Sequence, residues 1–410
     1  MRDANLQPAQ SLWTSFGEGP AKDHPGTTQK LSSAVPLNGR GSLRPSNPRL
    51  DASVFSLERQ HADSGLVSHR GECSSGAGRS HGRDVSAFGG RNRDGTPRFD
   101  QAVSSGGYLW WYVDALSDDG QYGLSLIAFV GSVFSPYYAS AIKKGLQPLP
   151  DHHCALNVAL YTPKGKLWSM TERPSSSVHR DACEFIIGPS SLHWDGQALH
   201  IDIDEWTVPL PRKIRGRVSV YPDQLFDFST PLDAKHRHHW GPIAPSAKVR
   251  VALSHPDQSW SGHAYLDSNE GIEPIAQSFT EWDWSRSPMS DGSTSVLYDC
   301  QFLEGEDRLL ALRFLNNGSI EHFEAPLRQK MPKTGWRLER RLRSDQPVRV
   351  AQQLEDTPFY QRALVHHDLM GERCVGFHET LNAKRFDAPW VQSLLPWRMP
   401  RIAYKTTPSR

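Results

Sequence analysis

The sequence has few cysteines, almost no net charge and no long apolar run. The five cysteines among the 410 residues are scattered and form no C-x-x-C pair, which argues against a disulfide framework or a zinc ribbon and favours a reducing cytosol. Lys and Arg number 46 and Asp and Glu 45, a balance that argues against a nucleic-acid-binding protein. The longest apolar run, residues 124–134, falls far short of the about 20 residues that span a bilayer, and the N-terminus lacks the apolar core of a signal peptide. We therefore expect a cytoplasmic protein that is soluble or at most peripheral on a membrane.

Motifs for nucleotide and nucleophile chemistry are missing as well. The sequence has no Walker loop, no G-x-G-x-x-G after an expected strand, no H-E-x-x-H and no strand-to-helix nucleophile elbow. These absences argue against a nucleotide cofactor and against a serine-hydrolase mechanism. We expect no cofactor.

Composition divides the chain near residue 95. Residues 1–95 are rich in Ser, Gly, Arg, Asp and His, and they hold few aromatic side chains. Such a segment buries too little apolar surface to offset the entropy lost on ordering, so we predict a disordered arm. A folded subdomain with a poor core is the alternative.

Beyond the arm, 30 Pro and 13 Trp in the whole chain favour strands and turns over a helical bundle. More than a dozen short apolar runs are separated by turns such as Ser117-Asp-Asp-Gly and Asn316-Asn-Gly, which are typical of hairpins. Helix signals are few and lie near residues 276–282 and 388–395. The sequence therefore predicts an all-β protein.

The number of strands predicts more than one sheet. We expect two barrels or sandwiches, one over residues 96–245 and one over residues 246–400, and then a tail at residues 401–410.

Two pairs of functional residues have strand spacing. His238 and Trp240 are two residues apart, and so are Tyr265 and Asp267. On a strand, each pair would share one face, so both pairs could converge in a barrel lumen as an acid, a base and two aromatic faces. The alternative is a surface turn rich in histidine, with Tyr265 and Asp267 merely ending a strand.

A metal site competes with this interpretation. His236 and His238, with His239 or a carboxylate, could bind zinc or non-haem iron. With 18 histidines in the chain, however, neighbouring histidines carry little weight, and the expectation remains that no metal is bound.

Several longer motifs resemble one family. Gly107-Tyr-Leu-Trp-Trp-Tyr-Val-Asp-Ala-Leu-Ser, Gly131-Ser-Val-Phe-Ser-Pro-Tyr-Tyr-Ala, Trp260-Ser-Gly-His-Ala-Tyr-Leu-Asp-Ser-Asn and Trp282-Asp-Trp-Ser-Arg look like segments of the carotenoid 1,2-hydratase, or hydroxyneurosporene synthase, family of phototrophic bacteria. The resemblance covers about residues 95–400. It implies two lipocalin-like barrels and the addition of water, without a cofactor, to the terminal double bond of acyclic carotenoids such as neurosporene and lycopene.

The resemblance also implies which residues act. The His, Trp, Tyr and Asp of the family's site correspond here to His238, Trp240, Tyr265 and Asp267. Protonation of an alkene needs a carboxylic acid that keeps its proton near neutral pH, which burial can provide, and we expect Asp267 in this role. The faces of Trp240 and Tyr265 could stabilise the tertiary cation. His238 could either orient Asp267 or take the proton of the attacking water.

Two other classes of function stay open at this point. A non-catalytic lipocalin-like carrier of apolar isoprenoids would need a tunnel lined by aromatic side chains, such as those of residues 108–138, but not the two pairs. A metal-dependent oxygenase would bind its metal through His236, His238 and His239, which we call the histidine row. The segment Trp390–Arg401 could pack on a barrel as a helix or rest on a membrane surface, and we favour packing.

Overall fold

The computed structural model describes residues 89–404. The arm predicted to be disordered therefore lies outside the described residues up to residue 88. For residues 89–95 the prediction was wrong, because they belong to the folded part. The amide of Arg98 donates to the carbonyl of Gly90, and the side chain of Arg91 is buried.

The first of two large antiparallel sheets holds twelve strands. Its order is β4-β3-β2-β1-β12-β11-β9-β8-β7-β6-β5, with β10 paired to β11. The strands are β1 (Tyr108–Ser117), β2 (Gly123–Val130), β3 (Cys154–Thr162), β4 (Gly165–Arg173), β5 (Val178–Arg180), β6 (Glu184–Ile187), β7 (Ser190–Trp194), β8 (Leu199–Trp206), β9 (Lys213–Pro222), β10 (Thr230–Pro231), β11 (His238–His255) and β12 (Asp257–Gly271).

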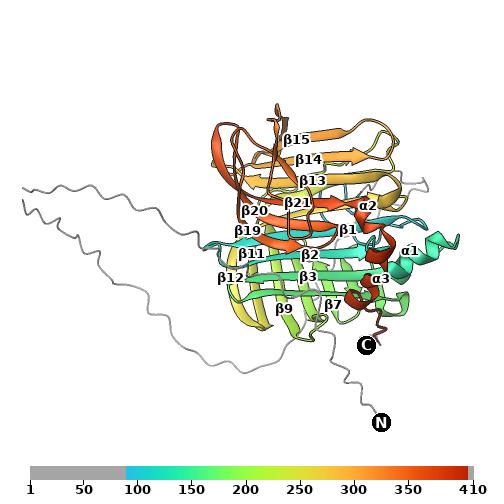
Figure 1. Cartoon of the computed structure of the whole chain (residues 1–410). Coiled ribbons are helices and arrows are strands. Elements are labelled where there is room, and N and C mark those ends of the chain that lie inside the picture. The colour runs from blue at the N-terminus through green and yellow to red at the C-terminus, as the bar shows by residue number, and fades with distance from the viewer. Residues whose placement is uncertain (1–88, 405–410) are drawn as a thin grey trace, which may run out of the picture. The chain divides into compact units, whose positions relative to one another are not determined.

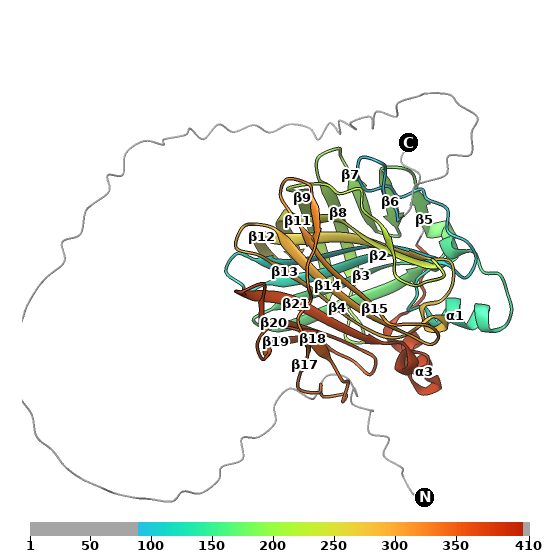
Figure 2. The same cartoon turned by 90° about the horizontal axis from the view of Figure 1, so that it is seen from above.

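The second sheet holds seven strands in the order β16-β15-β14-β13-β21-β20-β19. Figure 1 shows it above β1, β2 and β11 of the first sheet. The strands are β13 (Phe279–Pro288), β14 (Thr294–Phe302), β15 (Arg308–Phe314), β16 (Ile320–His322), β19 (Arg349–Asp356), β20 (Tyr360–Leu369) and β21 (Glu372–Asn382). A separate hairpin, β17 (Arg328–Lys330) with β18 (Arg341–Arg343), lies beside β19 and β20 (Figure 2).

Helices are few, and the prediction of a mostly β chain is confirmed. α3 (Pro389–Arg398) matches the helix expected at 388–395, and it contacts α1 (Pro136–Lys143). The short α2 is Ala383–Phe386. No helix among residues 89–404 is long and apolar enough to cross a membrane.

One expected helix is absent, and one helix of the structure was not expected. The helix expected at 276–282 is a short 3-10 turn, Ile275–Gln277, followed by strand β13. Trp282 and Trp284 alternate along β13 and are both buried, so the strand spacing outweighs the helix signal. α1 was missed, although Ser135 caps its N-terminus and Pro136 is its first residue.

The expected boundary after residue 245 falls inside β11. That strand pairs with β12 and β9, so the first sheet continues to Gly271 and the second begins at Phe279. All described residues belong to one compact unit. The change of sheet therefore comes later than expected.

The two faces of β1 show where the apolar cores lie. Leu109, Trp111 and Val113 belong to a core on one face of the first sheet. Tyr108 and Tyr112, on the opposite face, belong to a second core that includes residues of both sheets. The alternation of β1 therefore separates an inner core of the first sheet from an interface between the sheets.

The state of the cysteines agrees only in part with the expectation that they form no disulfide framework. Cys154, Cys300 and Cys374 are buried free thiols. Cys183 is disulfide-bonded, which the scattered spacing did not predict.

Arg91 holds the backbone of β11 at Gly241 and Pro242. Its guanidinium donates to the carbonyls of Gly241 at 2.5 Å and Pro242 at 3.0 Å, and to the hydroxyl of Ser268 at 2.7 Å. Gly241 is required there, because a Cβ atom would lie 1.9 Å from the carbonyl oxygen of Phe228. One side chain from the start of the folded part thus ties β11 to β12.

We expect Arg91→Ala to lower the free energy of unfolding by about 3 kcal/mol, because it leaves several buried acceptors without a donor. Urea unfolding followed by tryptophan fluorescence measures the change. Arg215→Ala, which removes a mostly exposed arginine on β9, is the matched control and should change it by less than about 1 kcal/mol. Equal effects of the two variants would contradict the role of Arg91.

Candidate active site

Strands β11 and β12 bring the four predicted residues to one face. Trp240 pairs with Asn269, and His238 pairs with Gly271, so the two strand-spaced pairs lie on neighbouring strands. The side chains of His238, Trp240, Tyr265 and Asp267 are all at most 3% exposed. The alternative of a surface turn is therefore wrong. The face they share is the interface between the two sheets rather than the lumen of one barrel.

Asp267 is held through one carboxylate oxygen. Its Oδ2 accepts hydrogen bonds from Trp240 Nε1 at 2.8 Å and from Tyr265 Oη at 2.9 Å. Its Oδ1 is buried and has no hydrogen-bond partner. The carboxyl group is therefore oriented by Trp240 and Tyr265, and Oδ1 is left for a proton.

Burial raises the pKa of Asp267 to about 8, although the hydrogen bonds from Trp240 and Tyr265 oppose the shift. The acid is therefore mostly protonated at neutral pH. Once its proton leaves, the same two donors stabilise the carboxylate. This combination of properties suits a general acid.

His238 has partners other than Asp267. Its Nδ1 lies 2.9 Å from Tyr108 Oη, and its Nε2 lies 3.5 Å from a carboxylate oxygen of Glu273 and makes no hydrogen bond. Burial lowers the pKa of His238, so the ring is mostly neutral at neutral pH. These contacts give no support to His238 as the residue that orients Asp267, since Trp240 and Tyr265 do so.

The second sheet supplies aromatic rings that the sequence reasoning did not assign to the site. The ring of Trp284 lies 5.4 Å from that of Tyr265, and the ring of Tyr298 lies 5.6 Å from that of Trp240. Trp284 Nε1 is buried without a partner. The spacing of Trp282 and Trp284 indicated that the two rings share one face of a strand. Nothing in that spacing indicates that the ring of Trp284 faces the first sheet.

A small pocket lies between the two sheets near the end of β1. Leu116 and Tyr161 line it from the first sheet, and Leu354, Leu364 and Phe377 line it from the second. The pocket therefore opens on the same interface that holds Asp267.

The histidine row does not assemble a metal site. His236 has a φ of 55° in the turn before β11, and its ring lies 6.2 Å from that of His239. Among residues 89–404, the group of donors close enough to share an ion is His179, Asp181 and Glu184, of which the first two are exposed. This surface group has no connection to the two predicted pairs.

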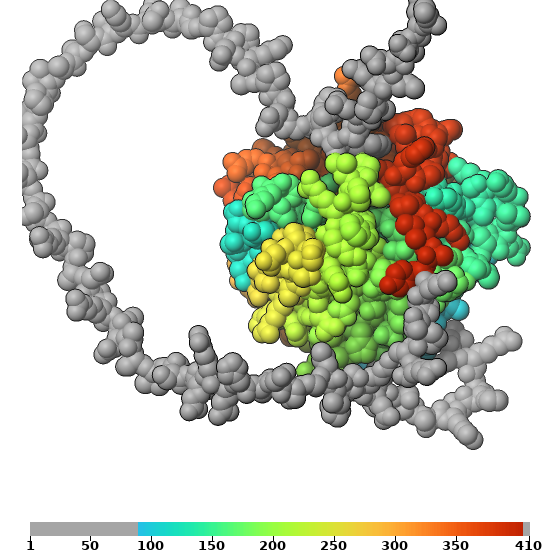
Figure 3. Space-filling view, turned by 90° about the horizontal axis from the view of Figure 1, so that it is seen from below, coloured from blue at the N-terminus to red at the C-terminus, as the bar shows by residue number. Residues whose placement is uncertain are grey.

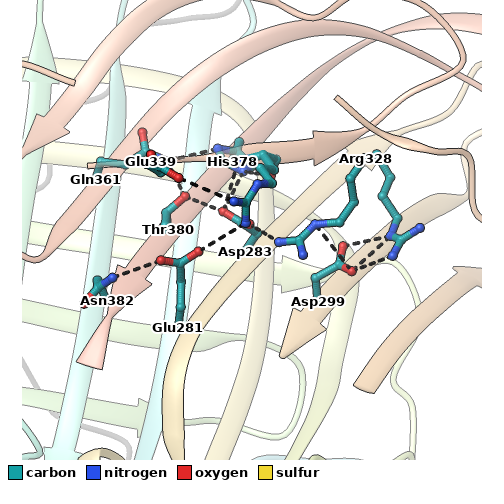
Figure 4. Close-up of polar contacts among 11 residues, drawn as sticks. Glu281, Asp283, Asp299, Arg328, Glu339, Gln361, His378, Thr380 and Asn382 are labelled. Atoms are coloured by element: carbon teal, nitrogen blue, oxygen red, sulfur yellow. Dashed lines mark hydrogen bonds and ion pairs between the residues drawn. The ribbon is translucent and has the colours of Figure 1, made fainter. Parts of the chain in front are cut away.

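A second polar cluster lies on the other face of β13 (Figure 4). Asp283 accepts from Arg328 at 2.6 Å and from Thr380 at 2.5 Å, and Asp299 accepts from Arg343 at 2.9 Å. Arg328 and Arg343 come from the β17–β18 hairpin. These ion pairs attach the hairpin to the second sheet, so we interpret the cluster as structural.

A β protein that encloses a neutral carboxylic acid among aromatic rings has the features expected of an enzyme that protonates an apolar substrate. The chain belongs to the carotenoid hydratase CrtC family, whose model matches residues 126–408. It is 50% identical over 404 residues to the acyclic carotenoid 1,2-hydratase of Rubrivivax gelatinosus, covering 98% of both chains. It is 44% identical to the enzyme of the same name from Thiocapsa roseopersicina, covering 98% of this chain and 100% of that one.

A solved structure of kievitone hydratase from Nectria haematococca is a distant match. It aligns with a TM-score of 0.43 and 10% identity over 70% of this chain and 92% of its own.

The raised pKa of Asp267 predicts how stability depends on pH. The unfolded chain releases this proton near pH 4, whereas the folded protein keeps it up to about pH 8. Rising pH therefore favours unfolding between these values, and the contribution is lost fully above the folded pKa. Asp267→Asn removes this dependence, so we expect its stability relative to the wild type to rise by about 1.4 kcal/mol per pH unit in this window.

Urea unfolding at several pH values between about 4 and 9 measures this difference. Asp202→Asn, at a half-exposed carboxylate paired with Arg217, is the control and should run parallel to the wild type. A parallel course for Asp267→Asn would mean that Asp267 ionises at an ordinary pH.

Proposed function

We propose that this chain adds water to the terminal double bond of acyclic carotenoids such as neurosporene and lycopene, and that Asp267 is the acid. The family and the names of the relatives support the reaction. The observation that carries the mechanism is the buried Asp267 carboxyl group, whose Oδ2 is held by two donors while Oδ1 has no partner.

The first step transfers the proton of Asp267 to the less substituted carbon of the double bond. The π electrons form the new C–H bond, and the other carbon becomes a tertiary cation. The developing carboxylate keeps its hydrogen bonds from Trp240 and Tyr265, which stabilise negative charge as it forms.

Aromatic faces stabilise the cation, which offers no hydrogen-bonding group. Trp240 and Tyr265 contribute from the first sheet, and Trp284 and Tyr298 contribute from the second. Each desolvated cation–π contact is worth about 2 kcal/mol, or about 30-fold in rate.

In the second step, water adds to the cation and the resulting oxonium loses a proton. Neutral His238, whose Nε2 makes no hydrogen bond, is a base able to accept it. The cycle closes when this proton returns to Asp267, so no cofactor and no metal are consumed or required. The small pocket that Leu354, Phe377 and Gln352 help to line is where the polyene would enter the interface.

For the domain organisation we propose two lipocalin-like halves, the twelve-stranded and the seven-stranded sheet, that enclose the substrate between them. We further propose a cytoplasmic protein that contacts the membrane through α3. Val391 and Leu395 pack inward, whereas Trp390 and Trp397 are 49% and 80% exposed. Figure 3 shows the red C-terminal part of the chain at the surface.

Asp267→Asn keeps the shape of the side chain and removes the acidic proton. We expect the conversion of lycopene to a hydroxylated product to fall at least about 10²–10⁴-fold, the loss typical of a missing general acid. In D₂O the wild-type product should gain one carbon-bound deuterium, next to the carbon that bears the hydroxyl. Product analysis by mass spectrometry measures both.

The control for this test is again Asp202→Asn, which should keep wild-type turnover. A folded Asp267→Asn protein that retains more than about a tenth of the activity would remove Asp267 from the mechanism. A wild-type protein that binds lycopene without converting it would instead be a carrier.

Activity should persist after extensive treatment with EDTA, because the proposed steps use only protein side chains and water. Turnover measured before and after chelation and gel filtration tests this. Loss of turnover that one particular metal restores would revive the metal-dependent alternative.

A further inference from the structure

The hydroxyl group of Tyr112 lies between two carboxyl groups. Its Oη is 2.7 Å from Asp114 Oδ2 and 2.8 Å from Glu379 Oε1. Tyr112 and Asp114 lie on β1, and Glu379 lies on β21 of the other sheet. Both distances are those of hydrogen bonds, yet a hydroxyl group has one hydrogen to donate. For both contacts to be hydrogen bonds, one carboxyl group must carry a proton and donate it to Tyr112.

The surroundings of these three groups admit little water, and the most exposed of them is the side chain of Glu379, at 12%. Arg286 Nε donates to Asp114 at 2.8 Å, and Arg362 Nε donates to Glu379 at 2.9 Å. Arg286 and Arg362 are at most 5% exposed. The remaining titratable side chains around the group are Tyr360 on β20, Tyr161 on β3, Tyr298 on β14, Glu355 on β19 and Lys166 on β4, which pairs with Glu355. In such a dry interface, a charge acts over a longer range than at the surface.

The same groups lie next to the acid of the proposed reaction. Tyr112 pairs with Asp267 across β1 and β12, and Asp114 pairs with Tyr265. The guanidinium of Arg286 lies 5.6 Å from the centre of the Tyr265 ring. Every change of charge in the group is therefore felt at Asp267 and at its hydrogen-bond donor.

We propose that Tyr112, Asp114 and Glu379 form a triad that shares a buried proton and sets the pH range in which Asp267 keeps the proton that it donates. This role rests on the function proposed above. The three are positioning residues, because they act through Asp267 and do not touch the substrate.

Electrostatics supports this role. The charges of Glu379 and Asp114 both raise the pKa of Asp267, beyond the larger effect of its burial. Burial raises the pKa of Asp114 itself to about 6, although Arg286 opposes the shift. The shared proton is therefore kept up to about pH 6, well above the pH at which an ordinary aspartic acid releases it, and above about pH 6 the full charge of the triad acts on Asp267.

Glu379→Gln tests the triad, because the amide oxygen can still accept from Tyr112 and Arg362 while the negative charge is gone. We expect the alkaline limb of the pH profile of kcat/KM for lycopene to move to lower pH by about 0.5–1 unit. Asp114→Asn should move the limb in the same direction. Asp283→Asn is the matched control, because it neutralises a buried carboxylate on the opposite face of β13, and its limb should stay in place.

Infrared spectroscopy tests the shared proton without any turnover. Asp267→Asn should retain the carbonyl band of a buried protonated carboxyl group at about pH 5, below the raised pKa of Asp114, and Glu379→Gln combined with Asp267→Asn should lose it at that pH. Titration of the Asp267 band in wild type and in Glu379→Gln gives the shift directly.

The outcomes separate the two proposals. If the wild type is active and the alkaline limb of folded Glu379→Gln lies at the same pH as that of the wild type, the triad is overturned and the proposed function stays intact. An inactive wild type overturns the proposed function, and the infrared titration still decides the triad. If Glu379→Gln and Asp114→Asn both fail to fold, absence of the retained band in Asp267→Asn overturns the shared proton.

Discussion

The burial of one carboxyl group between two sheets is the constraint on which the site depends. A carboxylate would be costly there, so Asp267 stays protonated where an exposed aspartate would be ionised. The hydrogen bonds from Trp240 and Tyr265 keep that cost moderate once the proton leaves. An acid that is neutral at rest and stabilised when ionised needs both features together: the first sheet provides the two donors, and the packing of the second sheet against it completes the burial.

The site was predictable from sequence wherever strand parity was enough. The spacing of His238 with Trp240, and of Tyr265 with Asp267, indicated shared faces, and the family resemblance added the roles. The neighbours could not be predicted, since pairing between distant strands leaves no local pattern. Nothing near residue 267 in the sequence indicates that Glu379 contributes to the field around it.

The fold shows the same division between local and distant information. Hairpins such as the one between β1 and β2 follow from turn residues, and the all-β class follows from the repeated short runs. The helix expected at 276–282 failed because sheet pairing of Phe279 onward overrides local periodicity. The structural role of Arg91 could not be predicted from the polar segment in which it lies, because its hydrogen-bond acceptors are on β11 and β12, far along the chain.

The contacts of Arg91 also bear on how the chain reaches its native state. Its partners Gly241 and Ser268 lie 150 and 177 residues further along the chain, and the bond between Asp114 and Arg286 spans 172 residues. During synthesis, β1 leaves the ribosome long before β12, β13 and β21 exist to cover its aromatic face. A topology with contacts this distant folds slowly, and the exposed face of β1 must avoid aggregation in the meantime. Assembly of the interface therefore has to wait until almost the whole chain has been made.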